Sequence, residues 1–348
     1  MELNKYKEYL LPTIEIYNRK TKEKIFNLLK EKEIIKTKDS EKVLMYQDDL
    51  ESKIEEFGKP IIKVIEEWEY IRDYQYSVLF KTNFIEKEDL NKLVQKSGLK
   101  RFSYDNDIEE IRDIISNPTV FEDSNQVILK FTLGKKAINP ETGEELKYKY
   151  IVNAVFHLES NLLEIRYNPI NGLFIDDYKS FYKKNISAVK AWINSYLGIK
   201  IEKFSIHRII DKLKTSDTLR LEGQDMRFSD GGKACLEIGS NKSYTLPLLG
   251  ELKDIINQNE EEFNKAIAIR QMLETWIESK EEEADYQWIC LCWPDSKGRK
   301  TYDVKVRFQF DYFDEDESLL YHYSGPVGME RMNNVVRTII DCSKGNTR

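Results

Sequence analysis

The chain has 348 residues, and its 54 Lys and Arg against 61 Asp and Glu give a formal net charge of −7. Its 41% hydrophobic residues, with 20 Tyr and 16 Phe, exclude a disordered protein, since such chains lack aromatic and branched aliphatic residues. The charge excludes a protein that coats nucleic acid through a generally basic surface, but it leaves a local basic face open.

The sequence predicts a cytoplasmic protein without a membrane segment. No stretch approaches the ~20 consecutive apolar residues of a membrane span. Met1–Lys5 lack the apolar stretch of a secretory signal. The 4 Cys are too few for a disulfide framework in a chain of this length, which favours a reducing compartment.

Residues 1–75 are predicted to form a small helical N-terminal region. We expect two helices within residues 5–33, with breaks at Pro12 and Asn18, and a helical connector at 48–73 with a break or kink at Pro60. Residues 34–46 indicate a β-hairpin. Helix followed by hairpin is the order of a winged helix, but the three-helix core expected before the wing is incomplete. The alternative is a helical cap on the next domain.

Residues 76–205 are predicted to form an α+β domain. Runs of strand type separated by short polar turns indicate an antiparallel meander at 127–167. An amphipathic helix is expected to follow at 173–197, and a strand at 199–204. The other expected elements are a strand at 77–81 and helices at 86–96 and 107–116.

Residues 206–348 are predicted to form a second α+β domain, with an antiparallel sheet and long helices. Its expected helices are 206–214, 248–257, 260–281 and 329–342. Its expected strands lie within 218–245 and at 286–293, 300–312 and 319–324. The whole chain is therefore predicted as α+β with two mainly antiparallel sheets and flanking helices. A parallel doubly wound fold is not expected, because the turns between strands are too short for crossover connections.

The sequence gives no motif for a cofactor or a metal, and we predict none. Cys290 and Cys292 face the same side of an expected strand, but a structural zinc site needs a second ligand pair. Neither a phosphate-binding loop nor a dinucleotide-binding glycine motif is present. An enzyme is therefore the less favoured class.

One alternative is a nuclease that depends on a divalent metal. In an antiparallel hairpin, Asp123 and Glu145 lie at opposite ends of the paired strands, so Glu145-Leu146-Lys147 cannot complete a site with Asp123. The cluster expected at the Asp123 end comprises Asp123, His157 and Glu164. Arg166 stands where a catalytic Lys is usual, and a polar sheet edge is the simpler interpretation.

The strongest asymmetry is a basic segment at 179–214, with nine Lys and Arg against Glu202 and Asp211, a local charge of +7. At ~100° per residue, Lys179, Lys183 and Lys190 fall within about 40° of one another on a helix and form a ridge. The aromatic residues share the phase of the core, so base stacking by them is not expected. The candidate phosphate-binding residues are Lys179, Lys183, Lys184, Lys190, Lys200, Lys203, Arg208, Lys212 and Lys214.

The opposing asymmetry lies at 251–285, where eleven acids face four bases, a local charge of −7. Because their charges are opposite, pairing of the two segments within one chain or between copies is an alternative to nucleic-acid binding. An acidic protein partner of the basic segment is a further alternative, and so is homo-oligomer formation.

These observations favour a non-enzymatic cytoplasmic binding or accessory protein that contacts nucleic-acid phosphates through the lysine ridge at 179–214. The predicted context is an accessory subunit of a bacterial or phage DNA-transaction or antiviral defence assembly. The alternatives are a scaffold for protein–protein interaction without a nucleic-acid role, and the metal-dependent nuclease.

Overall fold

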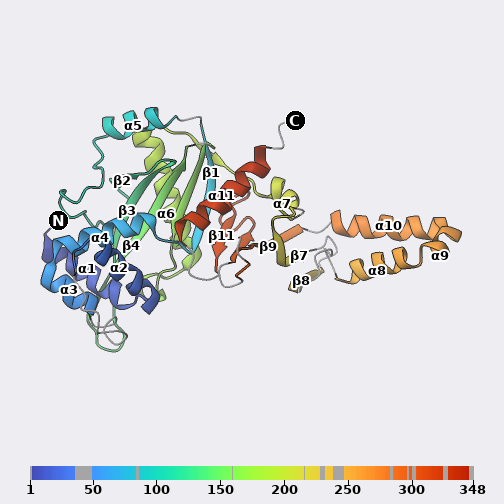
Figure 1. Ribbon diagram of the computed structural model, residues 1–348, viewed down its shortest axis with the longest axis horizontal. Coiled ribbons are helices and arrows are strands. Elements are labelled where there is room, and N and C mark those ends of the chain that lie inside the picture. Colours follow the sequence, from blue (N-terminus) through green and yellow to red (C-terminus); the bar gives the residue numbers. More distant parts are fainter. Residues whose placement is uncertain are drawn as a thin grey trace. The chain divides into compact units, whose positions relative to one another are not determined.

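The computed structural model describes residues 2–35, 49–83, 86–158, 160–214, 216–227, 232–237, 247–282, 285–295, 298–299, 303–323 and 328–344 (Figure 1). The chain divides into two compact units. The first unit spans residues 1–204 and 326–333, and the second spans 205–325 and 334–348. The predicted three-part division stays a prediction.

The first unit begins with four helices: α1 Leu3–Glu15, α2 Arg19–Glu31, α3 Asp49–Phe57 and α4 Lys59–Ile71. The predicted break at Pro12 is wrong, because α1 continues through it, with Tyr6, Leu10 and Ile14 buried along one face. The predicted break at Asn18 is confirmed, since its side chain accepts a hydrogen bond from Thr21 N and caps α2.

The predicted interruption near Pro60 lies at Gly58, whose φ of 62° suits glycine, and Pro60 occupies the first turn of α4, where no backbone N–H is needed. The winged-helix prediction is not confirmed. Most of its proposed wing at 34–46 lies outside the described residues, which end at 35 and resume at 49.

The sheet of the first unit is antiparallel, with strand order β2-β3-β4-β5-β1 and β6 paired to β1. The meander predicted at 127–167 is confirmed as β3, β4 and β5. The strands are β1 Tyr76–Thr82, β2 Thr119–Glu122, β3 Gln126–Ile138, β4 Glu145–His157, β5 Leu162–Tyr167 and β6 Ile201–Lys203.

Helices α5 Lys87–Lys96 and α6 Tyr178–Trp192 complete this unit, together with a 3₁₀ turn at Gly172–Phe174 and a π turn at Ile193–Leu197 that continues α6. The helix predicted at 107–116 is wrong. Arg112 instead lies beside β3, donating its N–H to Thr132 O and accepting from Gly134 N through its carbonyl. The backbone groups of Arg112 are thus satisfied by the strand rather than by a helix.

The two faces of this sheet differ in chemistry. One face is apolar and packs on α6, where Trp192 meets Phe131 and Tyr182 meets Tyr167, with ring centroids 5.5 Å and 4.9 Å apart. The opposite face is covered by α1 and α4 and carries buried polar side chains from neighbouring strands. These are Gln126, Lys130, Thr132, Lys149, Asn153, Glu164 and Arg166.

The second unit has strand order β11-β10-β9-β7-β8, also antiparallel. Its strands are β7 Arg220–Arg227, β8 Lys233–Glu237, β9 Asp285–Trp293, β10 Val304–Gln309 and β11 Leu319–His322. Its helices are α7 His207–Lys214, α8 Pro247–Gln258, α9 Glu260–Lys265 and α10 Ile267–Glu282, while α11 Met329–Lys344 contributes to both units.

Helices α8, α9 and α10 form a helical hairpin, which we call the helical arm (residues 247–282; orange in Figure 1). The single helix predicted at 260–281 is interrupted at Ala266, whose φ of −125° and ψ of 53° are not helical. The α+β class is confirmed. The predicted count of two separate sheets is not confirmed by the strand order. No helix among the described residues combines the length and apolar character needed to cross a membrane.

Candidate functional site

Two lysines lie on the covered face of the first unit's sheet with side chains that are 0% exposed. Lys130 comes from β3 and Lys149 from β4. A fully buried ammonium group is rare unless carboxylates compensate its charge, because leaving water costs several kcal/mol per ion. The role of these lysines therefore depends on which carboxylates lie next to them.

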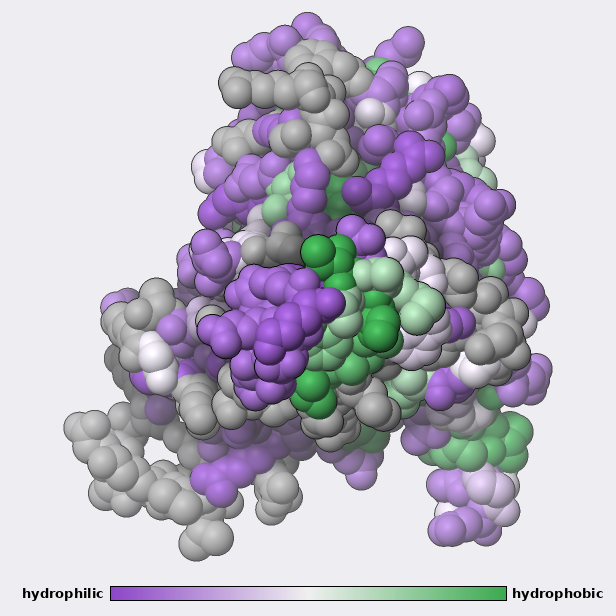
Figure 2. Space-filling view, turned by 90° about the vertical axis from the view of Figure 1, so that its right-hand side faces the viewer, coloured by the Kyte–Doolittle hydropathy of each residue, from purple (hydrophilic) through white to green (hydrophobic). Residues whose placement is uncertain are grey.

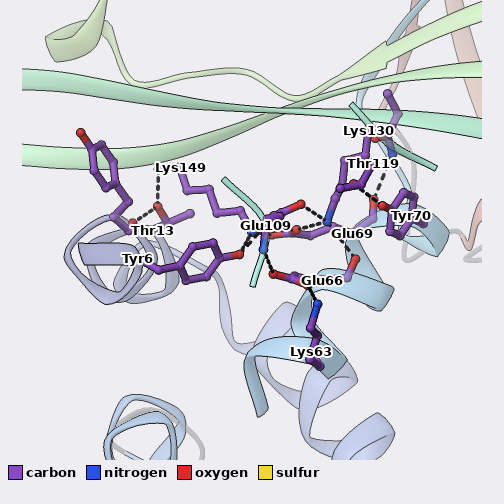
Figure 3. A network of polar contacts seen from close by, with 12 residues as sticks. Tyr6, Thr13, Lys63, Glu66, Glu69, Tyr70, Glu109, Thr119, Lys130 and Lys149 are labelled. Carbon is purple, nitrogen blue, oxygen red and sulfur yellow. Dashed lines mark hydrogen bonds and ion pairs between the residues drawn. The ribbon is translucent and has the colours of Figure 1, made fainter. Parts of the chain in front are cut away.

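Glu69, Glu109, Lys130 and Lys149 form an alternating arrangement of charges, which we call the charge ring (Figure 3). Lys130 Nζ lies 2.9 Å from the Glu69 carboxylate and 3.0 Å from that of Glu109. Lys149 Nζ lies 2.8 Å from each of the same two carboxylates. Two positive and two negative charges thus cancel out of contact with water.

The charge ring joins the N-terminal helices to the sheet. Glu69 belongs to α4, and Lys130 also donates to Glu66 O in that helix. From α1, Tyr6 donates its hydroxyl hydrogen to Glu109 at 3.1 Å, and Thr13 Oγ1 accepts from Lys149 N at 2.7 Å. Sheet and helices therefore share one buried polar network rather than a purely apolar interface.

The electrostatics around Lys130 and Glu109 favour the ionised forms of these two groups. Burial lowers the pKa of Lys130, but Glu109 and Glu69 outweigh burial and hold the pKa well above its usual value. Burial likewise opposes ionisation of Glu109, yet Lys130 and Lys149 lower its pKa to about 2. Neither Lys130 nor Glu109 is suited to act as a general acid or base near neutral pH. Their contacts with Glu69 and Tyr6 instead join the sheet to the N-terminal helices.

A cavity of about 260 Å³ reaches the edge of this network. Its lining includes Lys63, Glu66, Phe102, Glu109 and Thr132. Burial, followed by the charge of Glu109, raises the pKa of Glu66, whose carboxylate accepts from Lys63 Nζ at 2.8 Å and from Glu109 N at 3.0 Å. The cavity has room for a small polar molecule, but the Glu66 carboxylate in its lining is already engaged by Lys63 and by the Glu109 backbone.

The structure brings together two of the three predicted nuclease residues. His157 Nε2 lies 2.9 Å from Glu164 Oε2, and Arg166 Nη2 lies 2.6 Å from the same oxygen. Burial opposes ionisation of Glu164, but Arg166 and then His157 outweigh it and hold its pKa well below the usual range. Arg166 also donates to Asn333 at 2.7 Å. Glu164 is thus an ionised carboxylate held between Arg166 and His157.

Asp123, the third residue, has a different role. Its carboxylate accepts from Asn125 N and Gln126 N at 2.9 Å and 2.8 Å and closes the turn between β2 and β3. The strand register confirms that this end is distant from Glu145, since Gln126 pairs with His157 and Ile138 pairs with Glu145.

Six residues of the predicted lysine ridge lie in the first unit. Lys179, Lys183, Lys184 and Lys190 belong to α6, and Lys200 and Lys203 to the following segment. Lys179, Lys184, Lys200 and Lys203 are exposed. Lys183 and Lys190 are half-buried, and Lys190 Nζ lies 4.3 Å from the centre of the Phe80 ring. Two of the predicted ridge lysines, Lys183 and Lys190, therefore lie at the border between the buried and the exposed side of α6.

The remaining three, Arg208, Lys212 and Lys214, lie in α7 of the second unit. Arg208 and Lys212 are exposed. Lys214 Nζ donates to the Tyr286 hydroxyl at 2.6 Å and lies 3.7 Å from Asp211. These residues belong to a different unit from the α6 lysines, so the nine cations fall into two separate groups.

The cysteines on β9 sit among polar partners. Cys290 Sγ is 2.6 Å from the Tyr323 hydroxyl, and burial raises the pKa of Cys292 to about 12. A protonated thiol is a poor metal ligand. No group of three or more metal-binding side chains occurs within the described ranges.

Sequence reasoning missed the charge ring because its members are far apart in the chain. One local signal was present: Lys130 interrupts the apolar run Val127-Ile128-Leu129, and Lys149 lies between Tyr148 and Tyr150. A lysine inside such a run predicts a buried cation that needs carboxylates. The sequence does not identify Glu69 and Glu109 as those partners.

Comparison with known proteins gives no relative: no protein-family model matches the chain, and no curated protein or solved structure is similar to it. The function therefore has to be argued from the residues themselves.

Proposed function

We propose that the protein is a non-enzymatic binding protein that contacts nucleic-acid phosphates through one surface of its first unit. This α6–β6 surface comprises Lys179, Lys183, Lys184, Lys190, Lys200 and Lys203, with Tyr178 and Tyr196. The observation that carries the proposal is the charge of residues 178–204, which hold these six lysines and a single acid, Glu202.

The lysines of this surface differ from those of the charge ring in their access to water. Lys179, Lys184 and Lys203 are exposed, and the exposed Lys200 lies beside Glu202. Lys190 rests its stem near Phe80, an arrangement in which the apolar part of a lysine packs while its ammonium stays near the surface. A polyanion can therefore approach these ammonium groups, which supports phosphate binding.

Two tyrosines add a means of contacting bases. Tyr196 is 61% exposed and stacks on Trp192, with ring centroids 4.9 Å apart and planes inclined by 14°. Tyr178, at the start of α6, is 47% exposed. An exposed ring held by a neighbouring aromatic residue offers a base a stacking platform, typically worth about 1–3 kcal/mol per base. The expectation that the aromatic residues of this segment all face the core does not hold for Tyr178 and Tyr196, which are exposed.

The surface would bind without sequence preference. Lysine acts as a point charge and lacks the paired donors with which arginine reads guanine. Phosphate contacts made by such lysines release counterions, so affinity should fall steeply as salt rises. The role of accessory subunit in a bacterial or phage DNA-transaction or defence assembly, and the cytoplasmic location, belong to the proposal as its predicted context.

The test is a binding measurement at low salt with a mixed-sequence DNA duplex and a single-stranded RNA of equal length. The variant Lys179→Glu, Lys184→Glu, Lys203→Glu changes three exposed positions, and we expect at least a tenfold loss of affinity. The matched control is Lys92→Glu, Lys136→Glu, Lys265→Glu, which changes the charge equally at exposed lysines elsewhere. Absence of binding by the unmodified chain, or equal losses in both triple variants, would refute the proposal.

A further inference from the structure

The helical arm of the second unit has a small core for its length. Ile256 of α8 and Ile277 of α10 are buried against each other, and Leu252, Phe263 and Leu273 pack partly around them. Among the described residues this is the cluster that joins the two helices, and propensity alone adds little, because most helical stability in proteins comes from packing of an apolar face. A further apolar surface packed against the arm would therefore stabilise its helices.

Beside this core, α10 leaves a row of large apolar side chains exposed. Ile269, Met272 and Trp276 are 51%, 65% and 47% exposed. Their spacing of three and four residues places them within about 60° of one another at ~100° per residue. We call this row the α10 stripe. Figure 2 looks toward the end of the arm and shows apolar residues gathered next to strongly hydrophilic ones.

The α10 stripe continues the apolar arc that α8 covers. Leu273 and Ile277 lie on the covered part of α10, and the stripe lies directly beside them on the helix. An apolar face with this spacing is complementary to another helix, whose side chains fit into the grooves between successive turns. The geometry thus favours a helix that packs along α10.

Charge restricts which helix can bind. Residues 251–285 contain eleven acids and four bases. Among the bases, Lys265 and Arg270 are already engaged, with Glu262 and Glu274 at 2.7 Å and 2.8 Å. A second arm from another copy would bring the same negative charge, and nucleic acid would be repelled for the same reason. A helix with basic residues around its apolar face would be attracted.

We propose that the α10 stripe is a docking surface for an amphipathic, basic helix of a partner protein. Ile269, Met272 and Trp276 supply the apolar contact, and the acids of the arm select the charge of the partner. This inference uses the second unit only and is independent of the nucleic-acid proposal.

The test uses the full chain and two labelled 16-residue peptides in a fluorescence-anisotropy titration. Both peptides carry leucines at helical spacing; the remaining positions are lysine in one and glutamate in the other. We expect the lysine peptide to bind at least tenfold more tightly than the glutamate peptide. Met272→Glu should weaken that binding at least tenfold, although it adds a negative charge that would otherwise attract the peptide.

The control is Gln271→Glu, which adds the same charge at an exposed position on the other side of α10 and should change the affinity less than twofold. Circular dichroism of both variants checks that the arm is intact. The proposal is overturned if the two peptides bind equally, if neither binds, or if both variants lose affinity alike. A dimer of the full chain that Met272→Glu dissociates would also overturn it, because the stripe would then serve a second copy.

Discussion

Lysines on the two sides of the first unit's sheet have different surroundings. Lys130 and Lys149 are 0% exposed and each contacts both Glu69 and Glu109. On the other side, α6 carries Lys179 and Lys184 exposed to solvent. The same residue type thus forms a buried structural contact where two carboxylates lie against it, and a candidate binding surface where it is exposed to solvent. Exposure to solvent, rather than lysine content, separates the two roles.

The largest expected effect comes from breaking the charge ring. Glu69→Gln would leave the buried Lys130 and Lys149 with one carboxylate between them, and we expect a loss of about 3–5 kcal/mol in the free energy of unfolding. Urea unfolding measures this. Glu110→Gln, at a carboxylate whose side chain is 61% exposed, should cost less than about 1 kcal/mol. Equal effects of the two substitutions would contradict the assigned role of the ring.

The ring should also make the first unit sensitive to acid. The folded pKa of Glu109 is lowered from 4.5 to about 2, so its ionised form stabilises the folded protein above pH 4.5. That stabilisation is lost progressively as the pH falls from 4.5 to about 2. Unfolding free energies measured across this range should fall more steeply for the unmodified chain than for Glu109→Gln. Parallel curves would show that Glu109 is not the group responsible.

A smaller effect is expected where α1 approaches β3. A Cβ atom at Gly134 would lie 2.8 Å from Tyr9 Cε1 and 2.9 Å from Ile111 Cγ2, so Gly134→Ala should destabilise the protein by about 1–3 kcal/mol. Adding Tyr9→Leu removes one of the obstructing atoms and should recover part of the loss. A double-mutant cycle without coupling between these positions would contradict the close packing of α1 on the sheet.

The smallest effect separates lysines on the same helix. Lys190 is half-buried and lies over Phe80, so Lys190→Ala should cost about 0.5–1 kcal/mol through lost packing and cation–π contact. Lys184 is exposed, and Lys184→Ala should change the stability by less than about 0.5 kcal/mol. Thermal unfolding of the two variants tests whether Lys190 contributes to the packing of α6 while Lys184 does not. A larger loss of stability in Lys184→Ala than in Lys190→Ala would contradict this difference.

Much of the fold follows from local patterns. The strands at 127–167 alternate or run apolar between polar turns, and the structure has β3, β4 and β5 there. Local patterns failed where tertiary contacts decide. Residues 107–116 have helical spacing, yet Arg112 pairs with the backbone of β3. Pro12 should end a helix, yet α1 is held on both sides of it by buried residues.

The candidate sites show the same limit. The proximity of His157 and Glu164 could be predicted from the sequence, because it follows from the pairing of two consecutive strands. Asp123 lay at the correct end but serves its own turn. The charge ring joins residues from α4, β3, β4 and the segment before β2, so its assembly depends on how the N-terminal helices pack. No spacing in the sequence encodes that packing.

The most direct test of the proposed function is a lysine-modification footprint, with an acetylating reagent applied to the full chain alone and bound to a DNA duplex at low salt. Mass spectrometry of the peptides measures the reactivity of each lysine. The account predicts that Lys130 and Lys149 stay unreactive in both conditions, while Lys179, Lys184 and Lys203 react in the free chain and are protected in the complex. Unchanged reactivity of these three lysines in the complex would contradict it.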